Sequence, residues 1–272
     1  MEIAGKVGVI TGAASGIGRA VAADLARRNV RAMALVDMGD NIHAVAAEVD
    51  AVAGRRVAYP FQGDTTDDAF RASVFDSMSS QFDTTVTMCV PAAGITRDEL
   101  AVRIDKVSGK ARIYPVERFK QVIDVNLVAP VYWALEMIGR IAENRAAQGL
   151  KKWQPSAGMQ GAIVFIGSVS SQGNRGQISY ASTKAGLEGA AATIMKEAIY
   201  YGVRCGLIHP GFTDTPMVRA LGEDYIGKHI LPFTQLSRLI RPEEIADAIC
   251  FMLANSAVSG ELWADAGWHA PA

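Results

Sequence analysis

The sequence is poor in cysteine and has no excess of either charge. Its 272 residues include 3 cysteines, and 27 basic side chains balance 28 acidic ones, for a net charge of −1. Cys89, Cys205 and Cys250 are far apart and form no Cys-x-x-Cys pair, so we expect reduced, mostly buried thiols in a cytoplasmic protein. A general nucleic-acid-binding protein carries a basic excess, and we therefore expect no nucleic-acid partner.

Long hydrophobic runs are lacking as well. No unbroken run of 18 apolar residues occurs, and the chain passes from Met1 into a strand-like segment without a basic and apolar leader. We therefore expect neither a membrane-spanning helix nor a secretory signal. Half of the residues are nevertheless hydrophobic and only 20% are charged, which excludes a disordered chain. No repeat or flexible linker divides the sequence, so we expect one domain over residues 1–272.

Short apolar runs of strand length alternate with longer segments of helical periodicity. The runs are mostly continuous, which is typical of strands that are buried on both faces. Strand–helix alternation predicts an α/β fold of the doubly wound, Rossmann type, with about seven parallel strands and helices on both faces. The predicted strands are 7–10, 33–36, 57–61, 86–90, 162–166, 204–209 and 262–264, and the predicted helices are 17–28, 42–53, 67–82, 119–148, 177–201 and 242–254.

Three segments interrupt this alternation. Residues 97–115 and 148–161 are polar and basic, and we interpret both as surface loops. Residues 213–239 are longer, contain scattered apolar side chains and follow a strand. That is the position of a mobile lid over a ligand in such a sheet.

A glycine-rich segment joins the first predicted strand to the first helix, with glycines at positions 12, 16 and 18. Such glycines permit a tight turn and let a pyrophosphate approach the helix N-terminus. Asp37 ends the second strand, 19 residues after Gly18. A carboxylate there can accept both ribose hydroxyls of NAD and would repel the 2′-phosphate of NADP. We therefore predict NAD as the cofactor; the alternative for Asp37 is a helix-capping or solvated acid.

Tyr180 and Lys184 are four residues apart and are predicted to lie on one face of a helix. An unperturbed tyrosine titrates near pH 10, and a fixed cation beside it would stabilise the phenolate. Tyr180 could then exchange a proton with an alcohol. Ser168, twelve residues upstream at the end of a strand, could hydrogen-bond the substrate oxygen, with Ser170 as a weaker alternative.

These motifs, together with Ile95-Thr96-Arg97-Asp98 and Arg241-Pro242-Glu243-Glu244, resemble the short-chain dehydrogenase/reductase family, with the 3-oxoacyl-carrier-protein reductases as the nearest branch. The similarity extends over residues 6–268. The resemblance implies a Rossmann-type domain, usually tetrameric, that moves hydride between a nicotinamide and an alcohol or ketone. It implies a catalytic set of Asn126, Ser168, Tyr180 and Lys184, in which Asn126 holds a water that relays protons from Lys184.

The resemblance also implies the residues that contact cofactor and substrate. Asp64 would contact the adenine, Gly211 would leave room for the nicotinamide, and Thr213 would lie beside its carboxamide. The full cofactor set is Gly12, Ser15, Gly16, Ile17, Gly18, Asp37, Asp64, Thr65, Ala93, Gly94, Tyr180, Lys184, Pro210, Gly211, Thr213 and Thr215. The substrate set is Ser168, Val169, Tyr180 and Met217, and no metal is expected.

An apolar substrate pocket is expected from the residues around the lid, although ordinary packing within the lid is an equal alternative. The expected lining is Ile95, Val169, Met217, Ile226, Ile230 and Phe233. We interpret His209 as a structural histidine rather than a substrate contact, and His229 in the lid could be either.

The sequence departs from the family pattern at Pro91-Ala92, where two asparagines are usual, and in the segments 97–115 and 148–161. We expect these two insertions to border the substrate end of the sheet or the subunit surface. The sequence thus predicts an NAD-dependent alcohol dehydrogenase or ketone reductase that acts on a small molecule.

Two alternatives remain open. A 3-oxoacyl-carrier-protein reductase could use Arg97, Arg103, Lys106 and Lys110 to meet an acidic carrier. A regulator that senses NAD without turnover is disfavoured by the complete set of serine, tyrosine and lysine, because a sensor has no use for an activated phenol.

Overall fold

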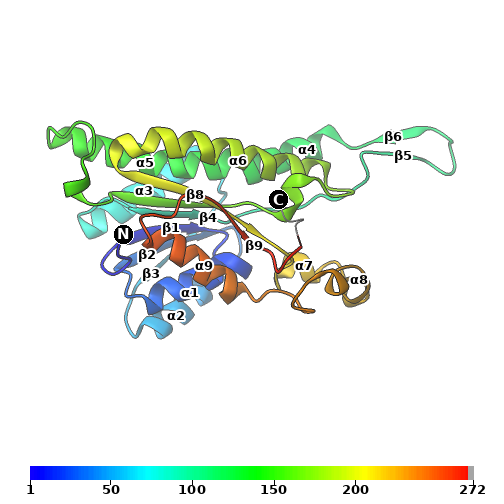
Figure 1. Ribbon diagram of the computed structural model, residues 1–272, viewed down its shortest axis with the longest axis horizontal. Coiled ribbons are helices and arrows are strands. Elements are labelled where there is room, and N and C mark those ends of the chain that lie inside the picture. Colours follow the sequence, from blue (N-terminus) through cyan, green and yellow to red (C-terminus); the bar gives the residue numbers. More distant parts are fainter. Residues whose placement is uncertain (269–272) are drawn as a thin grey trace.

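The computed structural model describes residues 1–268. A seven-stranded sheet runs through the centre of the molecule in the order β3-β2-β1-β4-β7-β8-β9, with every neighbouring pair parallel (Figure 1). Its strands are β1 (Val7–Thr11), β2 (Ala32–Asp37), β3 (Ala58–Gln62), β4 (Met88–Pro91), β7 (Gly161–Ile166), β8 (Val203–Pro210) and β9 (Gly260–Ala264). The predicted parallel sheet of about seven strands is confirmed.

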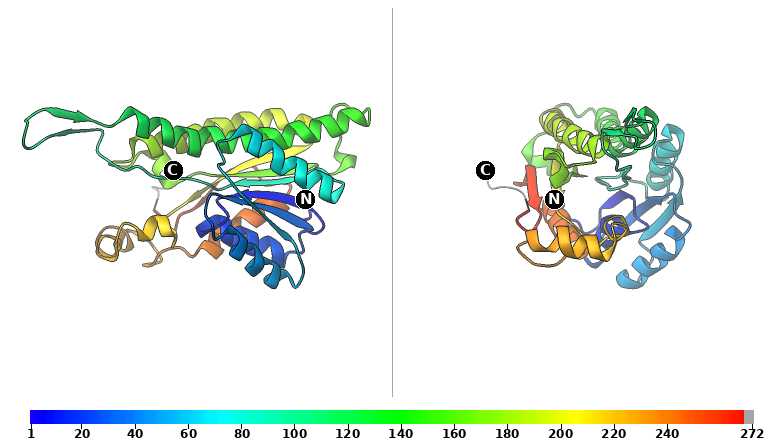
Figure 2. Two further views of the ribbon diagram at one scale, coloured as in Figure 1. Left: turned by 180° about the vertical axis from the view of Figure 1, so that it is seen from behind. Right: turned by 90° about the vertical axis from the view of Figure 1, so that its right-hand side faces the viewer.

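Helices cover both faces of this sheet, as the views of Figures 1 and 2 show. One face carries α1 (Gly16–Arg27), α2 (Ile42–Ala53) and α9 (Pro242–Ala254). The other carries α3 (Asp68–Phe82), α4 (Val116–Ile123), α5 (Ala129–Ala147) and α6 (Ile178–Ala198). Each face has its own apolar core, with Leu25 and Ile249 in one and Phe75 and Trp133 in the other. These buried side chains explain why the strands contain continuous apolar runs.

The predicted helix 119–148 is continuous, but it contains one wider turn. Helix α4 passes through a π-helical turn at Asp124–Val128 into α5. By length and composition alone, Val116–Ala147 could cross a membrane, a test that core helices of soluble proteins also pass. Two residues of this stretch, Trp133 and Met137, are fully buried against the sheet.

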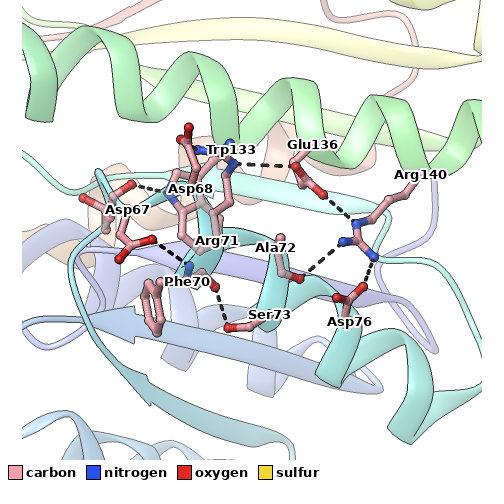
Figure 3. Close-up of polar contacts among 11 residues, drawn as sticks. Asp67, Asp68, Phe70, Arg71, Ala72, Ser73, Asp76, Trp133, Glu136 and Arg140 are labelled. Atoms are coloured by element: carbon pink, nitrogen blue, oxygen red, sulfur yellow. Dashed lines mark hydrogen bonds and ion pairs between the residues drawn. The ribbon is translucent and has the colours of Figure 1, made fainter.

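Helices α3 and α5 are joined by polar contacts that also fix a loop at the cleft (Figure 3). Arg140 of α5 binds Asp76 of α3 at 2.6 Å and Glu136 of its own helix at 2.9 Å. The indole nitrogen of Trp133 donates a hydrogen bond of 2.9 Å to the main-chain oxygen of Thr65. The loop that follows β3 is therefore anchored by α5.

The segments that interrupt the alternation have more structure than the sequence indicated. Residues 97–115 contain an antiparallel hairpin, β5 (Val102–Ile104) and β6 (Ala111–Ile113), that projects from the body of the protein (Figures 1 and 2). Residues 213–239, the segment predicted to be a lid and called the lid below, contain α7 (Pro216–Arg219) and α8 (Glu223–His229). Both lie beyond the carboxyl ends of the strands.

The second insertion, residues 148–161, lies at the other end of the sheet. The main-chain nitrogen of Trp153 donates to Tyr200 and that of Gln160 donates to Gly202, both just before β8 begins. This is the amino edge of the parallel strands, opposite the edge where the hairpin and the lid lie (Figure 1). The expectation that this insertion borders the substrate end is therefore wrong, and only its alternative, the subunit surface, remains.

Candidate active site

A cleft of about 620 Å³ opens at the carboxyl ends of β1, β2 and β4. Ligands of doubly wound folds bind at this edge, where successive connections leave the sheet on opposite sides. Thirteen of the predicted cofactor residues line the cleft: Gly12, Ser15, Gly16, Ile17, Gly18, Asp37, Asp64, Thr65, Ala93, Gly94, Tyr180, Lys184 and Thr215. Pro210, Gly211 and Thr213 instead line an adjoining pocket.

The glycines of the first loop are required by the space around them. Gly12 has a φ of +66°, and a Cβ there would lie 2.7 Å from the main-chain nitrogen of Ala93. A Cβ on Gly18 would overlap the carbonyl oxygen of Gly12. The loop is therefore closely packed where it turns into α1. The first N–H groups of that helix face the cleft, in the arrangement that binds phosphates.

Asp37 is held at the wall of the cleft by two main-chain groups. One carboxylate oxygen accepts from the nitrogen of Ala14 at 3.0 Å, and the other accepts from the nitrogen of Gly39 at 2.9 Å. These bonds fix the carboxylate beside the glycine loop. The side chain ends β2 as predicted.

Pro91-Ala92 is compensated by Thr11 at the end of β1. The main-chain oxygen of Thr11 accepts from the nitrogen of Ala92 at 3.2 Å, and its hydroxyl accepts from the nitrogen of Ala93 at 3.1 Å. The segment after β4 is thus braced without the two amides that the family pattern usually has.

Asn126 occupies the π-helical turn and is fully buried. Its amide nitrogen donates to the oxygen of Ile95, and its amide oxygen accepts from the nitrogen of Ile95, each at 2.8 Å. The side chain therefore braces the segment after β4 and is not directed at Lys184. The main-chain carbonyl of Asn126 is therefore the group with which the expected water relay remains compatible, and that role stays a prediction.

Tyr180 lies where the cleft meets a second pocket of about 130 Å³, and it lines both. Ser168, which is buried, lines the second pocket and hydrogen-bonds Tyr180. The Ser170 hydroxyl donates to Gln177 at 2.8 Å instead. The structure thus favours Ser168 over Ser170 as the partner of Tyr180.

The Lys184 ammonium lies on the cofactor side of Tyr180. Its Nζ donates a bond of 2.7 Å to the main-chain oxygen of Ile166, and it is 5.4 Å from the centre of the Tyr180 ring. Burial lowers the pKa of Lys184 to about 8. At neutral pH most of the amine is still charged.

The expected lowering of the Tyr180 pKa is not present in this structure. Removal of the phenol from water raises the pKa of Tyr180 to about 12, although the hydrogen bond with Ser168 acts in the opposite direction and Asp98 raises the pKa further. The Lys184 ammonium is bound to a carbonyl, and it does not overcome the effect of burial. Tyr180 is therefore a protonated phenol at neutral pH, the form that donates a proton.

Comparison of the sequence with known protein families agrees with the arrangement of the cleft, Ser168, Tyr180 and Lys184. The short chain dehydrogenase family model matches residues 6–226. This chain belongs to the short-chain dehydrogenase family. It is therefore an oxidoreductase of a family that typically uses a nicotinamide cofactor, as the sequence motifs predicted.

This short-chain dehydrogenase is similar in sequence to two relatives and in fold to one solved structure. It is 31% identical over 264 residues to the 3-oxoacyl-[acyl-carrier-protein] reductase FabG of Escherichia coli, and the aligned region covers 96% of each chain. It is 29% identical over 265 residues to the (3R)-3-hydroxyacyl-CoA dehydrogenase of Canis lupus familiaris, which covers 94% of this chain and 92% of the relative. A short-chain type dehydrogenase/reductase from Mycobacterium marinum matches with a TM-score of 0.82 at 24% identity, over 99% and 98% of the two chains, and supports the fold.

The pocket beside Tyr180 in this short-chain dehydrogenase differs in part from the expected lining. Val169 and Met217 line it, whereas Ile95 lines the cleft. Ile226 and Ile230 pack with Leu239 into a small core inside the lid. Phe233 is 65% exposed. The expectation for Ile226, Ile230 and Phe233 is therefore wrong, and packing within the lid explains the two isoleucines.

Sequence reasoning missed several residues that line this pocket. They are Thr96, Asp98, Gln177, Phe212, Val218 and Leu221. Met217, Val218 and Leu221 belong to one face of a short helical segment, a spacing that could have indicated them.

Three residues after β8 also have structural contacts of their own. A Cβ on Gly211 would lie 2.6 Å from the main-chain oxygen of Asp265, so the chain packs closely at this glycine. Thr213 is buried and donates to the oxygen of Gly211. Thr215 caps α7 by accepting from Val218, and it lines both the cleft and the pocket.

His209 is a buried, hydrogen-bonded histidine, as favoured from the sequence. Its Nδ1 is 3.1 Å from the main-chain oxygen of Ser168, and its Nε2 is 3.2 Å from Glu261. The ring stacks on Trp263 with 4.0 Å between centres. His209 therefore fixes the backbone of Ser168 from behind. His229 is exposed on the lid.

Proposed function

We propose that this protein is an NAD-dependent oxidoreductase that interconverts a secondary alcohol and a ketone. The observation that carries the proposal is the position of Tyr180. Its side chain, with Ser168 as hydrogen-bond partner, lies at the junction of a dinucleotide-sized cleft and a smaller pocket. A non-catalytic NAD sensor would not require these two hydroxyl groups at that junction.

The residues at this junction divide the chemistry among them. Ser168 and Tyr180 both line the smaller pocket, where their hydroxyls would hydrogen-bond one substrate oxygen and stabilise charge that develops on it. Tyr180 donates the proton to that oxygen in reduction and accepts it in oxidation. Lys184 contributes positive charge on the cleft side. A nicotinamide bound in the cleft would supply or accept the hydride.

Asp37 supports NAD rather than NADP. Its carboxylate is fixed at the cleft wall, and Ser15 and Met38, which also line that part of the cleft, carry no positive charge. A 2′-phosphate on the adenosine ribose would meet a fixed negative charge, whereas two ribose hydroxyls would find an acceptor.

A 3-oxoacyl thioester is the substrate class that we propose within this reaction type. The relatives named above are a 3-oxoacyl-carrier-protein reductase and a 3-hydroxyacyl-CoA dehydrogenase. The apolar side chains of Val169, Met217 and Leu221 in the pocket suit an acyl chain. The assay that tests the proposal follows nicotinamide absorbance with NADH and a 3-oxoacyl thioester of N-acetylcysteamine; absence of turnover with this and other ketones would reject it.

We further propose that the protein is a homotetramer, or at least a dimer. Val128, Tyr132 and Leu135, from the π-helical turn and α5, expose two-fifths or more of their surface, although they belong to an apolar helix. A second copy would cover such side chains. Light scattering is expected to give at least twice the monomer mass of 29.0 kDa, and a stable monomer at micromolar concentration would contradict this.

A further inference from the structure

Three arginines surround a single carboxylate beside the hairpin. Glu99 is 3.2 Å from Arg103, 3.6 Å from Arg112 and 2.9 Å from Arg118. The carboxylate has only 13% of its side chain exposed, whereas each arginine keeps nearly half of its side chain in solvent. The three arginines and Glu99 together carry a net charge of +2. This excess positive charge is on the half-exposed guanidinium groups.

The register of the hairpin brings two of these arginines together. Arg103 of β5 lies directly opposite Arg112 of β6, so both side chains lie on one face of the ribbon. Val102 and Ile104 lie on the other face, which is apolar. Like charges directly opposite each other destabilise a two-stranded ribbon. The repulsion between the two arginines therefore destabilises the hairpin by itself, and a bound anion would reduce that repulsion.

The hairpin is fastened to the segment that leads to Tyr180. The main-chain nitrogen of Glu99 donates to Gly176 at 2.9 Å, and Glu99 forms a bridge with Gln177. Gln177 lines the substrate pocket and precedes Tyr180 by three residues, about 4.5 Å along a helix axis. Through Glu99, the arginine cluster therefore adjoins Asp98 and Gln177, two residues of the wall of the pocket in which the ketone is expected.

Two other carboxylates near the cluster are already engaged. Asp98 accepts from the Gln177 side chain at 2.8 Å, and Asp105 accepts from the main-chain nitrogens of Val107 and Ser108 in the hairpin turn. Glu99 is the carboxylate to which all three arginines are bound.

We propose that Arg103, Arg112 and Arg118 form a subsite for a phosphate group carried by the substrate at a distance from its reacting carbonyl. The planar guanidinium binds phosphate through paired, charge-assisted hydrogen bonds. A pocket of about 130 Å³ holds the acyl end of a thioester but not the phosphate-bearing arm behind it. This subsite rests on the proposed reduction of a 3-oxoacyl thioester and explains how its carrier is recognised.

The test compares substrates with and without phosphate groups. The wild type and the double variant Arg112→Gln/Arg118→Gln are assayed with a 3-oxoacyl-CoA, with the same acyl group on a carrier-protein phosphopantetheine arm, and with its N-acetylcysteamine thioester. We expect kcat/KM to fall about tenfold to a hundredfold for a phosphate-bearing substrate, and less than twofold for the N-acetylcysteamine thioester. Whichever carrier shows the loss identifies the source of the phosphate.

The matched control is Lys120→Gln, which removes one exposed positive charge from α4, the helix that carries Arg118, outside the arginine cluster. Its effect on every thioester should be small. The proposal is overturned if the double variant loses the same factor on all three substrates, because the arginines would then only hold the hairpin in place. It is also overturned if Lys120→Gln has an effect as large as the double variant, because general charge attraction would then suffice.

Failure of the proposed function itself would look different, since the wild type would reduce none of the thioesters. A binding measurement then decides the subsite separately. Calorimetric titration with 3′,5′-ADP, the phosphate-bearing end of CoA, in the presence of saturating NAD should show binding to the wild type that the double variant lacks. Equal binding to both proteins would overturn the subsite.

Discussion

The cofactor cleft and the substrate end of this molecule are constrained in opposite ways. Around the cleft, residues are fixed by close packing of the backbone, as at Gly12, where a side chain would run into the segment after β4. At the substrate end, the hairpin is almost entirely in solvent, and Val107 at its turn is 97% exposed. The cleft is therefore shaped by buried geometry, whereas the hairpin carries surface residues that the core does not constrain.

The sharpest test at the junction of the two regions is Tyr180→Phe. The ring and its packing are retained and only the proton-exchanging hydroxyl is lost, so turnover should fall by about 10²–10⁴-fold while NAD binding remains. Steady-state kinetics and cofactor fluorescence titration measure the two effects. Tyr200→Phe, the same change at the exposed far end of this helical stretch, is the control. Retention of more than about a tenth of wild-type kcat would reject Tyr180 as the acid.

The cofactor side is tested by Asp37→Ala. Loss of the fixed carboxylate removes both the acceptor for the ribose hydroxyls and the repulsion of a 2′-phosphate. The ratio of kcat/KM for NADH over NADPH should therefore fall by about 10- to 100-fold, mostly through weaker binding of NADH, as expected for loss of a charged hydrogen bond. A wild-type enzyme that uses NADPH as well as NADH would contradict the assignment before any variant is made.

The pH dependence separates the two titrating groups of the site. Tyr180, with a pKa near 12, stays protonated throughout the neutral range, whereas Lys184 loses its charge as the pH rises through about 8. Ketone reduction should therefore be constant below pH 8 and decline by up to about tenfold above it, because the stabilising cation is lost. In Lys184→Met the rate should be low at every pH, without the inflection. A persistent inflection would assign it to another group.

Prediction from the sequence succeeded where local patterns reflect burial. Continuous apolar runs identified the strands, and the spacing of glycines and acids placed Asp37 at the cleft. It did not show contacts that depend on the direction of a side chain or on close packing between distant segments. The amide of Asn126 is directed at Ile95, and the chain at Gly211 packs closely against Asp265. Neither contact is local in sequence, so no periodicity could have shown it.

The hairpin of residues 97–115 was also not predicted from the sequence, which indicated only a surface loop there. Its strands have three residues each, shorter than most of the runs from which the strands of the central sheet were predicted, and all six residues are exposed. Alternating apolar residues on either side of the turn signal at Gly109, which has a φ of +66°, were the signal that could have found it. The pairing of Arg103 with Arg112 follows only from the register.

The smallest expected effect is on stability when the hairpin is shortened. Replacing residues 103–112 by Asn-Gly, so that a two-residue turn joins Val102 to Ile113, retains the cross-strand pair at the base of the hairpin. The ion pairs lost from Glu99 involve half-exposed arginines, and such pairs contribute about 0–1 kcal/mol. The melting temperature should therefore change by less than about 4 °C, with NAD binding unaltered. Trp133→Ala, in the core beneath the cofactor loop, should by contrast cost about 3–5 kcal/mol. A hairpin deletion as damaging as Trp133→Ala would show that the substrate end is part of the folding core after all, and the separation between the two regions would fail.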